Sequence, residues 1–442
     1  MDGPQDHPED GPGGADRAGG VLTLKVLLVN KFHYKKGGSE TYYFTLAQAL
    51  QSQGHQVVYF AMADEKNEPC DQSKFFVSHV DYNSDSQNVF GRIWSGIKLI
   101  YSTESKKKMR LLIEREKPDL AILNLVHRQL TLSIVDELRK FRVPIFFVMH
   151  DLICICPNYT MLSHGKLCER CSGGHFLNCP RQKCVKGSFP KSLLAAAEAY
   201  FYKWRKTYDK VDLYIAPSVF LQHKLQSAGF THSPIVHMRN PLPADTVYGL
   251  PEKAENYFLY FGRLSPEKGV LTLLKAVKEL RELGKIALRI AGDGPQRPEL
   301  EQYVRENELA DQVSFLGFQT GQKLRDTVER CRCVILPSEC YENCPYSILE
   351  AMVKGRPCIV SNLGGLPELV EDGKNGYVFQ ARDVDSLRGA IEKLLSLNAE
   401  EYSGMCTDAL NKAKEEFDPN RYLDRLFGEY RRIKPASEDD NE

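Results

Sequence analysis

The amino-acid sequence predicts an α/β protein made of two doubly wound domains whose parallel sheets face a central cleft. Short apolar runs alternate with amphipathic segments along the chain, which is the pattern of strands and helices in such sheets. The alternation stops at the proline-containing stretch that begins near Asn240, and it starts again after Asn256. The chain has 442 residues, which is large for a single hydrophobic core, so two domains are expected.

The first domain is expected over residues 23–241. Its predicted strands are the apolar runs 25–30, 57–61, 120–125, 143–149 and 213–218. A glycine-containing loop follows the first run, and a helix is predicted from Ser39 to Gln53, with Gly54 ending it. A cysteine-rich insert at 152–190 interrupts the alternation. Ligands of parallel sheets bind beyond the carboxyl ends of the strands, so polar residues at those ends are candidates for function.

The second domain is expected over residues 257–415, after a linker at 242–256. Its predicted strands are 257–263, 287–292, 313–317, 333–338, 357–361 and 377–379. The periodic segment 416–434 follows the last of these strands, and it is predicted to form a helix that packs back on the first domain. Residues 1–22 and 435–442 are predicted to be a disordered leader and a disordered tail.

The composition restricts the partners and the location. Lysine plus arginine equals aspartate plus glutamate at 58 each, so no overall field attracts nucleic acid. The sequence has no run of about 18 apolar residues, and the leader has no apolar segment like that of a signal peptide. The 13 cysteines of such a chain are expected to be reduced thiols, and the protein is expected to be cytoplasmic. Nothing in the sequence indicates an oligomeric state.

The segment from Ser338 to Gly355 directly follows a predicted strand. Pro345 suits the first turn of a helix, and Gly355 suits its end. Glu342 then lies in the loop before the helix and Glu350 lies on the helix. The two carboxylates flank a helix N-terminus, where free N–H groups favour an anion such as a diphosphate. On this hypothesis Glu350 reaches a ribose and Glu342 reaches a sugar.

Two cations follow the first strand of the same domain, in the segment GRLSPEKG. Arg263 and Lys268 could hold a diphosphate there and offset the charge that develops on it when a glycosidic bond breaks. Each of these charged residues, taken alone, is more often a solvated surface group. Their occurrence together after strands of one domain favours a nucleotide-sugar site.

Six segments occur in order along the chain: Gly37-Gly38-Ser39-Glu40, HD at His150, GRLSPEKG, AGDGP at Ala291, FLGF at Phe315 and the block ENCPYSILEAMVKGRPCIVSNLGGLPELVEDG. In these segments the chain resembles the family-4 glycosyltransferases of the GT-B fold, which has two Rossmann-like domains. A bacterial subgroup of that family carries a cysteine-rich insert after the HD motif. The resemblance implies a retaining enzyme that needs no metal or other cofactor for transfer.

The implied reaction moves a hexose-type sugar from a nucleoside-diphosphate sugar to a hydroxyl group. The donor would be a UDP-, GDP- or other nucleotide-sugar, and the acceptor a glycan, a lipid-linked molecule or a small molecule, as in polysaccharide biosynthesis. The implied catalytic residues are His150, Arg263, Lys268 and Glu342. The implied donor-binding residues are Gly37, Gly38, Arg263, Lys268, Gly317, Phe318, Glu342, Asn343, Cys344, Pro345 and Glu350.

Three details bear on the resemblance. The chain has Asn124 and His127 where related sequences have a histidine-rich strand end, so the acceptor side departs from the family pattern. His150 ends an apolar run, and a lone histidine there is usually structural; the family context favours contact with the sugar or the acceptor instead. The triplet Asp383-Val384-Asp385 is interpreted as a helix start and not as a metal site.

The insert contains a Cys168-x2-Cys171 pair with the spacing of a zinc knuckle. Cys156 and Cys184 could complete a tetrahedral structural zinc site, with Cys179 as an alternative ligand. A set of reduced, partly buried thiols is the competing interpretation. Catalytic zinc is not expected, because four thiolates leave no open coordination position.

Two predicted helices mix aromatic residues and cations, one from Arg92 and one from Ser192. Such faces could rest on the inner surface of a membrane and reach a lipid-linked acceptor, or they could simply combine a core stripe with a solvated face.

Three rival functions remain open from the sequence. A nucleotide-sugar epimerase or a phosphorylase can share the two-domain cleft, although a phosphorylase needs a lysine-bound pyridoxal phosphate. A non-catalytic, zinc-stapled scaffold that binds nucleotide-sugars is the third. A dinucleotide-binding dehydrogenase fits less well, because AGDGPQRP lacks the third glycine of the phosphate-binding fingerprint.

Overall fold

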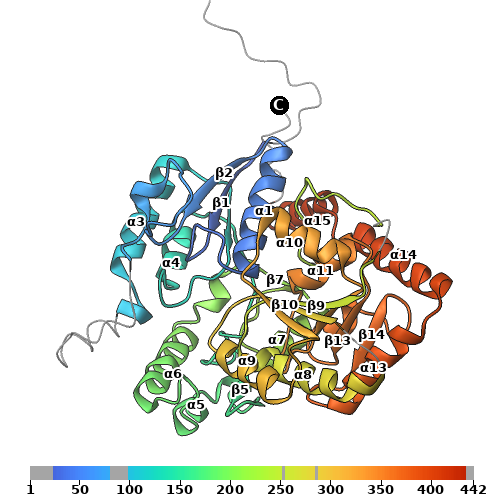
Figure 1. Cartoon of the computed structure of the whole chain (residues 1–442). Helices are drawn as coiled ribbons and strands as arrows, with labels where there is room; N and C mark the ends of the chain where they lie inside the picture. Colours follow the sequence, from blue (N-terminus) through green and yellow to red (C-terminus); the bar gives the residue numbers. More distant parts are fainter. Residues whose placement is uncertain (1–22, 80–97, 251–253, 284–286, 435–442) are drawn as a thin grey trace, which may run out of the picture.

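The computed structural model describes residues 23–79, 98–250, 254–283 and 287–434, which form two adjoining α/β domains (Figure 1). Each domain contains a six-stranded sheet with parallel pairing throughout. The strands are short and mostly buried, and they are rich in Val, Ile, Leu and Phe, as expected for sheets covered by helices on both faces. The predicted fold class, two Rossmann-like domains of the doubly wound type, is therefore confirmed.

The sheet of the first domain has the strand order β2-β1-β3-β4-β7-β8. Its strands are β1 (Lys25–Val29), β2 (Gln56–Phe60), β3 (Leu120–Leu123), β4 (Ile145–Val148), β7 (Leu213–Ala216) and β8 (Ile235–His237). Its longer helices are α1 (Gly38–Ser52), α3 (Thr103–Glu116), α4 (Ser133–Lys140), α6 (Phe189–Trp204) and α7 (Val219–Ala228). The edge strand β8 is not among the predicted strands, because three residues give too short a pattern.

The sheet of the second domain has the order β11-β10-β9-β12-β13-β14. Its strands are β9 (Tyr257–Phe261), β10 (Ala287–Ala291), β11 (Val313–Gly317), β12 (Cys333–Leu336), β13 (Cys358–Ser361) and β14 (Gly376–Phe379). Its helices include α8 (Val270–Glu279), α9 (Arg297–Glu306), α10 (Gly321–Arg330), α11 (Tyr346–Val353), α12 (Leu366–Leu369) and α13 (Val384–Ser396). The strand order reverses between β9 and β12, so the loops that follow these two strands open at the crevice where parallel sheets bind ligands.

The side chain of Asp383 caps α13 by accepting a hydrogen bond from the Ser386 N–H. This confirms the interpretation of the aspartate triplet as a helix start.

The insert after β4 forms a hairpin and a short helix that support α6. The hairpin pairs β5 (Leu162–Ser163) with β6 (Lys166–Leu167), and α5 (Asn178–Arg181) follows it. A small core separate from that of the domain joins the insert to α6 through Cys171, Phe176, Cys179, Ala196 and Ala199.

The C-terminal helices pack on both domains. Helix α14 (Ala399–Glu416) packs against α11 of the second domain, whereas α15 (Pro419–Ile433) packs against α1 of the first. The hydroxyls of Tyr42 and Tyr422 join α1 to α15 at 2.5 Å. The helix predicted over 416–434 thus begins at Pro419, because α14 extends to Glu416. Within the described residues, no helix is both long and apolar enough to cross a bilayer.

Candidate active site

Lys268 and Glu342 meet beyond the second sheet. Lys268 ends a short 3₁₀ turn, η4 (Pro266–Lys268), which follows β9, and Glu342 lies in the loop between β12 and α11. The Lys268 ammonium donates to Glu342 Oε1 at 2.5 Å, and the Ser338 hydroxyl donates to the same oxygen at 2.6 Å. Burial is the largest single influence and lowers the pKa of Lys268, but the charge and hydrogen bond of Glu342, together with nearby Cys340 and Tyr260, outweigh it, so the pKa is raised overall. The ammonium therefore stays charged at neutral pH.

Two glycines hold the loop that carries Glu342. The Gly365 N–H donates to the Glu342 carbonyl at 2.6 Å. A Cβ atom placed on Gly364 would lie 2.2 Å from that carbonyl oxygen, and one on Gly365 would lie 2.2 Å from the Asn343 carbonyl oxygen. Gly364 also has a left-handed φ of 66°. Only glycine permits this close approach, so the segment after β13 fixes the position of Glu342.

Helices α1 and α11 begin close together, one in each domain. A Cβ atom on Gly38 would lie 3.8 Å from the ring of Tyr346, the first residue of α11. Pro345 is the N-cap residue, one position before the predicted first turn. Two helix N-termini therefore present free N–H groups at the cleft, where they favour an anion.

Arg263 is exposed at the same edge of the sheet. It follows β9, and its guanidinium forms no ion pair with any residue that the structure describes. Arg263 is thus available to a ligand, although the structure does not bring it into contact with Glu342.

Asn343 connects the two domains. Its Nδ2 donates to the carbonyl oxygen of His150 at 3.1 Å. Its Oδ1 is buried and has no hydrogen-bond partner among the described residues. The next residue, Cys344, accepts a hydrogen bond on its carbonyl from Asn240 at 2.9 Å. A buried amide oxygen without a donor is costly, and a ligand hydroxyl in this position would remove that cost.

Glu350 lines a separate part of the cleft. A cavity of about 390 Å³ lies between the start of α1, the segment 242–247, helix α10 and Glu350. Burial raises the pKa of Glu350 to about 7, and Arg325 across the cavity acts in the opposite direction. Tyr346 also lines this cavity, whereas Glu342 does not. The two glutamates thus lie in different parts of the cleft, as their different predicted roles require.

His150 follows β4 and is neutral. Burial lowers its pKa to about 3. Asn124 Nδ2 donates to the Val29 carbonyl, which turns its Oδ1 toward His150 Nε2 at 2.9 Å. Nε2 must carry the proton, because an amide oxygen can only accept. The ring also packs edge-on against Tyr42, with centroids 5.0 Å apart. His150 is therefore a fixed, uncharged group beside the cleft and not a protonated acid.

A smaller cavity of about 200 Å³ lies next to His150, wholly in the first domain. It is lined by Lys31, Leu125, His127, Arg128, Gln129, Asp151, Ile153 and Tyr159. Burial lowers the pKa of Lys31, and its ammonium makes no hydrogen bond or ion pair with any described residue. Arg128 and Tyr159 have left-handed φ angles of 69° and 53°. Strained backbone of this kind concentrates at functional sites.

Gly317 and Phe318 lie at the end of β11. Gly317 has a φ of 69°, and the ring of Phe318 is 74% exposed. An exposed ring that follows a strand at the crevice is available for stacking. Its assignment to the base of a donor stays a prediction.

The insert cysteines gather in one region. Burial raises the pKa of Cys156 to about 11, and it raises the pKa of Cys171 and Cys179 to about 12. Neighbouring thiols, among them Cys168 and Cys184, add to these shifts. Yet no three His, Cys, Asp or Glu side chains in the described part of the chain are arranged to hold a metal ion. All the described cysteines are free thiols. The zinc site stays a prediction from the sequence.

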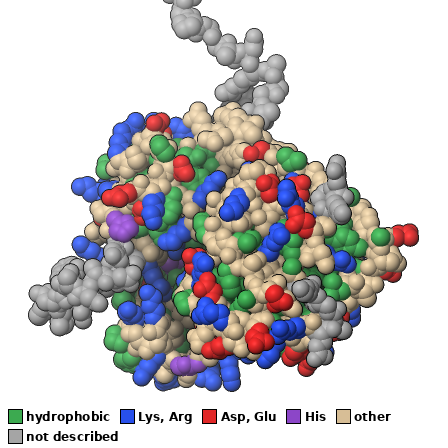
Figure 2. Space-filling model, in the orientation of Figure 1, with side chains coloured by type: hydrophobic (Ala, Val, Ile, Leu, Met, Phe, Trp, Pro, Cys, Tyr) green, Lys and Arg blue, Asp and Glu red, His purple; other side chains and the backbone are tan. Residues whose placement is uncertain are grey.

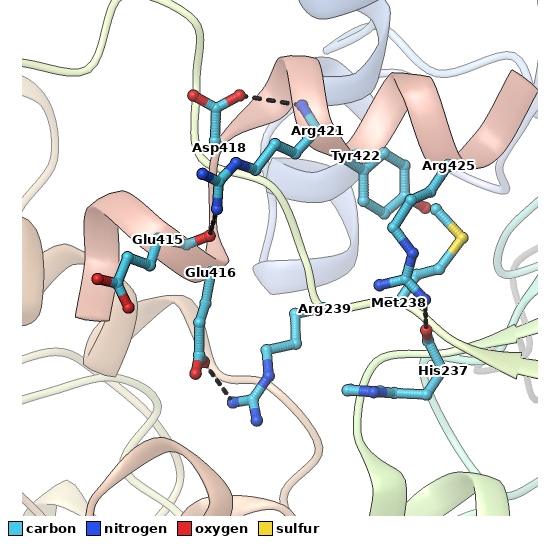
Figure 3. Close-up of a pocket in the computed structure, with 9 residues that line it drawn as sticks. All are labelled: His237, Met238, Arg239, Glu415, Glu416, Asp418, Arg421, Tyr422 and Arg425. Atoms are coloured by element: carbon cyan, nitrogen blue, oxygen red, sulfur yellow. Dashed lines mark hydrogen bonds and ion pairs between the residues drawn. The ribbon is translucent and has the colours of Figure 1, made fainter. Parts of the chain in front are cut away.

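A third cavity lies away from these residues, where the chain passes between the domains. It measures about 330 Å³, and Figure 3 shows that β8 and the segment after it face the end of α14 and the start of α15 across it. Arg239 pairs with Glu416 at 3.0 Å, and Arg425 donates to the His237 carbonyl at 2.7 Å. This cavity contains none of the residues predicted for the donor.

The structure thus brings together some predicted residues and separates others. Lys268 contacts Glu342, and Asn343 contacts the backbone of His150, whereas Glu350 lines a cavity that Glu342 does not reach. Ser338 and Lys31 were missed as site residues. Ser338 lies two residues after the end of β12, and its position near a strand end was the available signal. No local pattern marks Lys31, because its cavity is formed by four separate loops.

The chain is similar to known glycosyltransferases in sequence and in fold. Residues 36–246 match the model of Glycosyltransferase Family 4, and residues 248–414 match that of Glycosyl transferases group 1. An alpha-D-kanosaminyltransferase of Streptomyces kanamyceticus is 33% identical over 187 residues, which are 42% of this chain and 47% of that protein. A lipopolysaccharide 1,6-galactosyltransferase of Escherichia coli is 26% identical over 49% of this chain and 60% of that protein. Each match spans less than two thirds of the relative.

Solved structures share the whole fold. Anabaena HepE in complex with UDP and glucose has a TM-score of 0.65 and 18% identity, covering 92% of this chain and 98% of that one. A sucrose-phosphate synthase from Thermosynechococcus elongatus has a TM-score of 0.69 and 19% identity, covering 94% and 100%. At these identities the likeness establishes the fold, which is GT-B.

Proposed function

Because the chain carries the two domains of a GT-B glycosyltransferase of the family 4 and group 1 type, we propose that it is a retaining glycosyltransferase. It transfers a hexose-type sugar from a nucleoside-diphosphate sugar to the hydroxyl of a glycan or lipid-linked acceptor. The observation that carries the proposal is the Lys268–Glu342 pair beside the N-terminus of α11, with Asn343 reaching His150 across the cleft. UDP is bound in the HepE structure, which makes a UDP-sugar the first donor to test.

The diphosphate of the donor sits between Lys268, Arg263 and the free N–H groups of α11. These groups stabilise the negative charge that grows on the diphosphate as the bond between the sugar and the phosphate breaks. The carboxylate of Glu350 accepts hydrogen bonds from the ribose hydroxyls. Glu342, held by Lys268 and Ser338, accepts hydrogen bonds from the transferred sugar and fixes its orientation.

The acceptor hydroxyl attacks the sugar from the face that the diphosphate leaves, which retains the anomeric configuration. The new bond joins the acceptor oxygen to the anomeric carbon, and the bond from that carbon to the phosphate oxygen breaks. The acceptor proton passes to the departing phosphate oxygen, so no carboxylate nucleophile is needed. Neutral His150 borders the reacting sugar, and its bond to Asn124 keeps it in one orientation.

A thermal-shift screen across UDP-, GDP-, ADP- and TDP-sugars tests the donor, and product analysis by NMR with the best donor tests the chemistry. We expect one nucleotide series to stabilise the protein and the product to keep the donor's anomeric configuration. An inverted product would disprove retention. An isomerised sugar formed from donor alone would indicate an epimerase, and the absence of stabilisation by every nucleotide would contradict the proposal as a whole.

A further inference from the structure

Helix α6 presents an apolar stripe to solvent. The exposed side chains Phe189, Leu193, Ala197, Tyr200 and Trp204 recur every three or four residues, so they share one side of the helix; this set is called the α6 face. Phe189 is 50% exposed and Trp204 is 79% exposed. Leu177 of the neighbouring insert is 49% exposed as well. A soluble domain rarely leaves several large apolar side chains aligned in this way.

The surroundings of the α6 face are strongly basic. Residues 170–206 contain eight Lys or Arg and a single acid, Glu198, which is buried. Arg181, Lys183, Lys186, Lys191 and Lys206 are exposed, and none of them forms an ion pair with a residue that the structure describes. Figure 2 shows apolar and basic side chains together over α5 and α6, at the lower left of the molecule. Positive charge and exposed apolar groups on one surface match an anionic bilayer.

The described part of the other predicted membrane helix does not have this arrangement. The first part of that segment, 92–97, lies outside the described residues. In α3, Met109, Leu112 and Ile113 are buried, and Leu111 is the large apolar side chain exposed at 45%. Apart from Leu111, the large apolar residues of α3 are thus in the core, whereas α6 buries three alanines and Tyr202 and exposes Phe189, Leu193, Tyr200 and Trp204.

The inner side of α6 borders the acceptor side of the cleft. Glu198 Oε2 lies 3.5 Å from Arg128 Nε, and Arg128 lines the cavity of about 200 Å³ that also contains Lys31 and Asp151. The Tyr202 hydroxyl accepts a hydrogen bond from the N–H of Leu132, which lies a few residues after Arg128 in the chain. A surface that contacts the α6 face is therefore separated from this cavity by about the thickness of one helix, roughly 10 Å.

We propose that the α6 face, with Leu177 and the surrounding lysines, docks the protein on an anionic lipid bilayer. The aromatic rings enter the interface between headgroups and acyl chains, and the lysines contact the anionic headgroups. In this arrangement the insert supports the docking helix, because its small core packs on Ala196 and Ala199 and holds α6 in place. Docking also brings a lipid-linked acceptor to the cavity beside His150, a step that rests on the proposed function.

Vesicle binding tests the proposal without substrates. The sequence contains two tryptophans, so a Trp94→Phe variant of the full chain leaves Trp204 as the only tryptophan reporter. We expect this variant to float with phosphatidylglycerol vesicles but not with phosphatidylcholine vesicles, and its emission to shift to the blue. Raised salt should weaken the binding. Flotation without an emission shift, or no flotation at low salt, would overturn the proposal.

Variants separate the α6 face from general adhesion. Lys183→Gln, Lys186→Gln and Lys191→Gln together should lower the vesicle partition coefficient by roughly a hundredfold. In the chain with both native tryptophans, Phe189→Ser with Trp204→Ser should lower it at least about tenfold. The matched controls Lys275→Gln, Lys278→Gln and Lys323→Gln on the second domain, and Leu111→Ser on α3, should leave it unchanged. Equal losses in the control and test variants would refute the assignment.

Two further measurements, light scattering and a transfer assay, distinguish membrane docking from dimerisation and from the proposed function. If light scattering shows a wild-type dimer that the Phe189→Ser, Trp204→Ser variant abolishes, a second copy occupies this face and the proposal is wrong. Transfer to a water-soluble acceptor should be the same in this variant and in the wild type. A failure of vesicle binding would therefore leave the glycosyltransferase assignment intact, and a failure of transfer would leave the docking surface intact.

Discussion

The two sides of the cleft differ in how their polar groups are satisfied. In the second domain Lys268, Glu342 and Ser338 bond to one another, so these charges are already paired, although Arg263 and the buried Asn343 Oδ1 have no such partner within the described chain. In the first domain Lys31 makes no ion pair within the described chain, and one carboxylate oxygen of Glu198 is buried without a hydrogen-bond partner there. Arg128 adopts a left-handed backbone conformation between them.

The two sides of the cleft therefore reach a defined geometry in different ways. On the second-domain side, where we propose that the donor binds, the Lys268–Glu342–Ser338 contact exists without a ligand, which favours electrostatic stabilisation of a leaving diphosphate at low reorganisation cost. The first-domain side keeps strained backbone and unpaired groups that a bound molecule can satisfy. Recognition of the acceptor is therefore expected to depend more on loops and on the insert than on a paired network.

The largest expected effect is that of Glu342→Gln. Removing the charge that Lys268 and Ser338 hold should reduce kcat by about 10²- to 10³-fold, with a small change in the donor KM. The control is Glu339→Gln, because Glu339 pairs with Arg382 and accepts from Thr272 outside this contact. Steady-state kinetics measure kcat for both variants. Similar losses of kcat would mean that Glu342 contributes only to the overall negative charge of this region and not through its specific contacts.

Glu350→Gln should act on binding and not on transfer. Its carboxylate lines the cavity of about 390 Å³ and not the Lys268–Glu342 contact. We expect the Kd of the nucleoside diphosphate, measured by calorimetry, to rise about 10- to 100-fold, while kcat at saturating donor changes little. A selective fall in kcat would show that the two glutamates are not functionally separate.

Gly364→Ala tests the preorganisation of the donor side. The new Cβ would meet the Glu342 carbonyl oxygen at 2.2 Å at a φ of 66°. We expect the loop to shift and the melting temperature to fall, with a cost of about 1–3 kcal/mol. The control is Gly373→Ala, which has a similar φ of 78° but no atom within 4 Å of the new Cβ. If the melting temperature and kcat fall equally in both variants, close packing of Gly364 on Glu342 is not the cause of the loss.

The raised pKa of Glu350 predicts a pH effect on stability. The folded protein binds this proton up to about pH 7, whereas the ordinary pKa is 4.5, so the free energy of unfolding should fall as pH rises between these values. Glu350→Gln removes this titration. The melting temperature of the variant relative to wild type should therefore increase from pH 5 to pH 8. A constant difference would show that Glu350 is ionised throughout.

The smallest expected effect concerns zinc in the insert, on the first-domain side. If the sequence prediction is correct, protein purified without added metal should contain about one zinc per chain, and a chelator should destabilise α6 and its support without removing donor binding. Elemental analysis and a nucleotide thermal shift measure the two parts. Less than about half an equivalent per chain would count against the site.

The repeating α/β architecture and the motifs of the proposed donor site could be predicted from the sequence. Eleven strand runs could be predicted because apolar periodicity is local, and Lys268, Glu342 and Glu350 lie in short segments directly after β9 and β12 or on the helix that follows. Parallel strands whose order reverses between β9 and β12 bring the loops after them together, so these residues could be predicted to share a site.

The contacts that each of these residues makes could not be predicted and came from the three-dimensional structure. It separated Glu350 from Glu342, joined Asn343 to His150 across the domains and turned one apolar side of α6, from Phe189 to Trp204, toward solvent. The physical reason is that such contacts join segments far apart in the chain. Local periodicity specifies that a helix forms and which of its sides is apolar, but it does not specify whether that side meets a core or remains exposed.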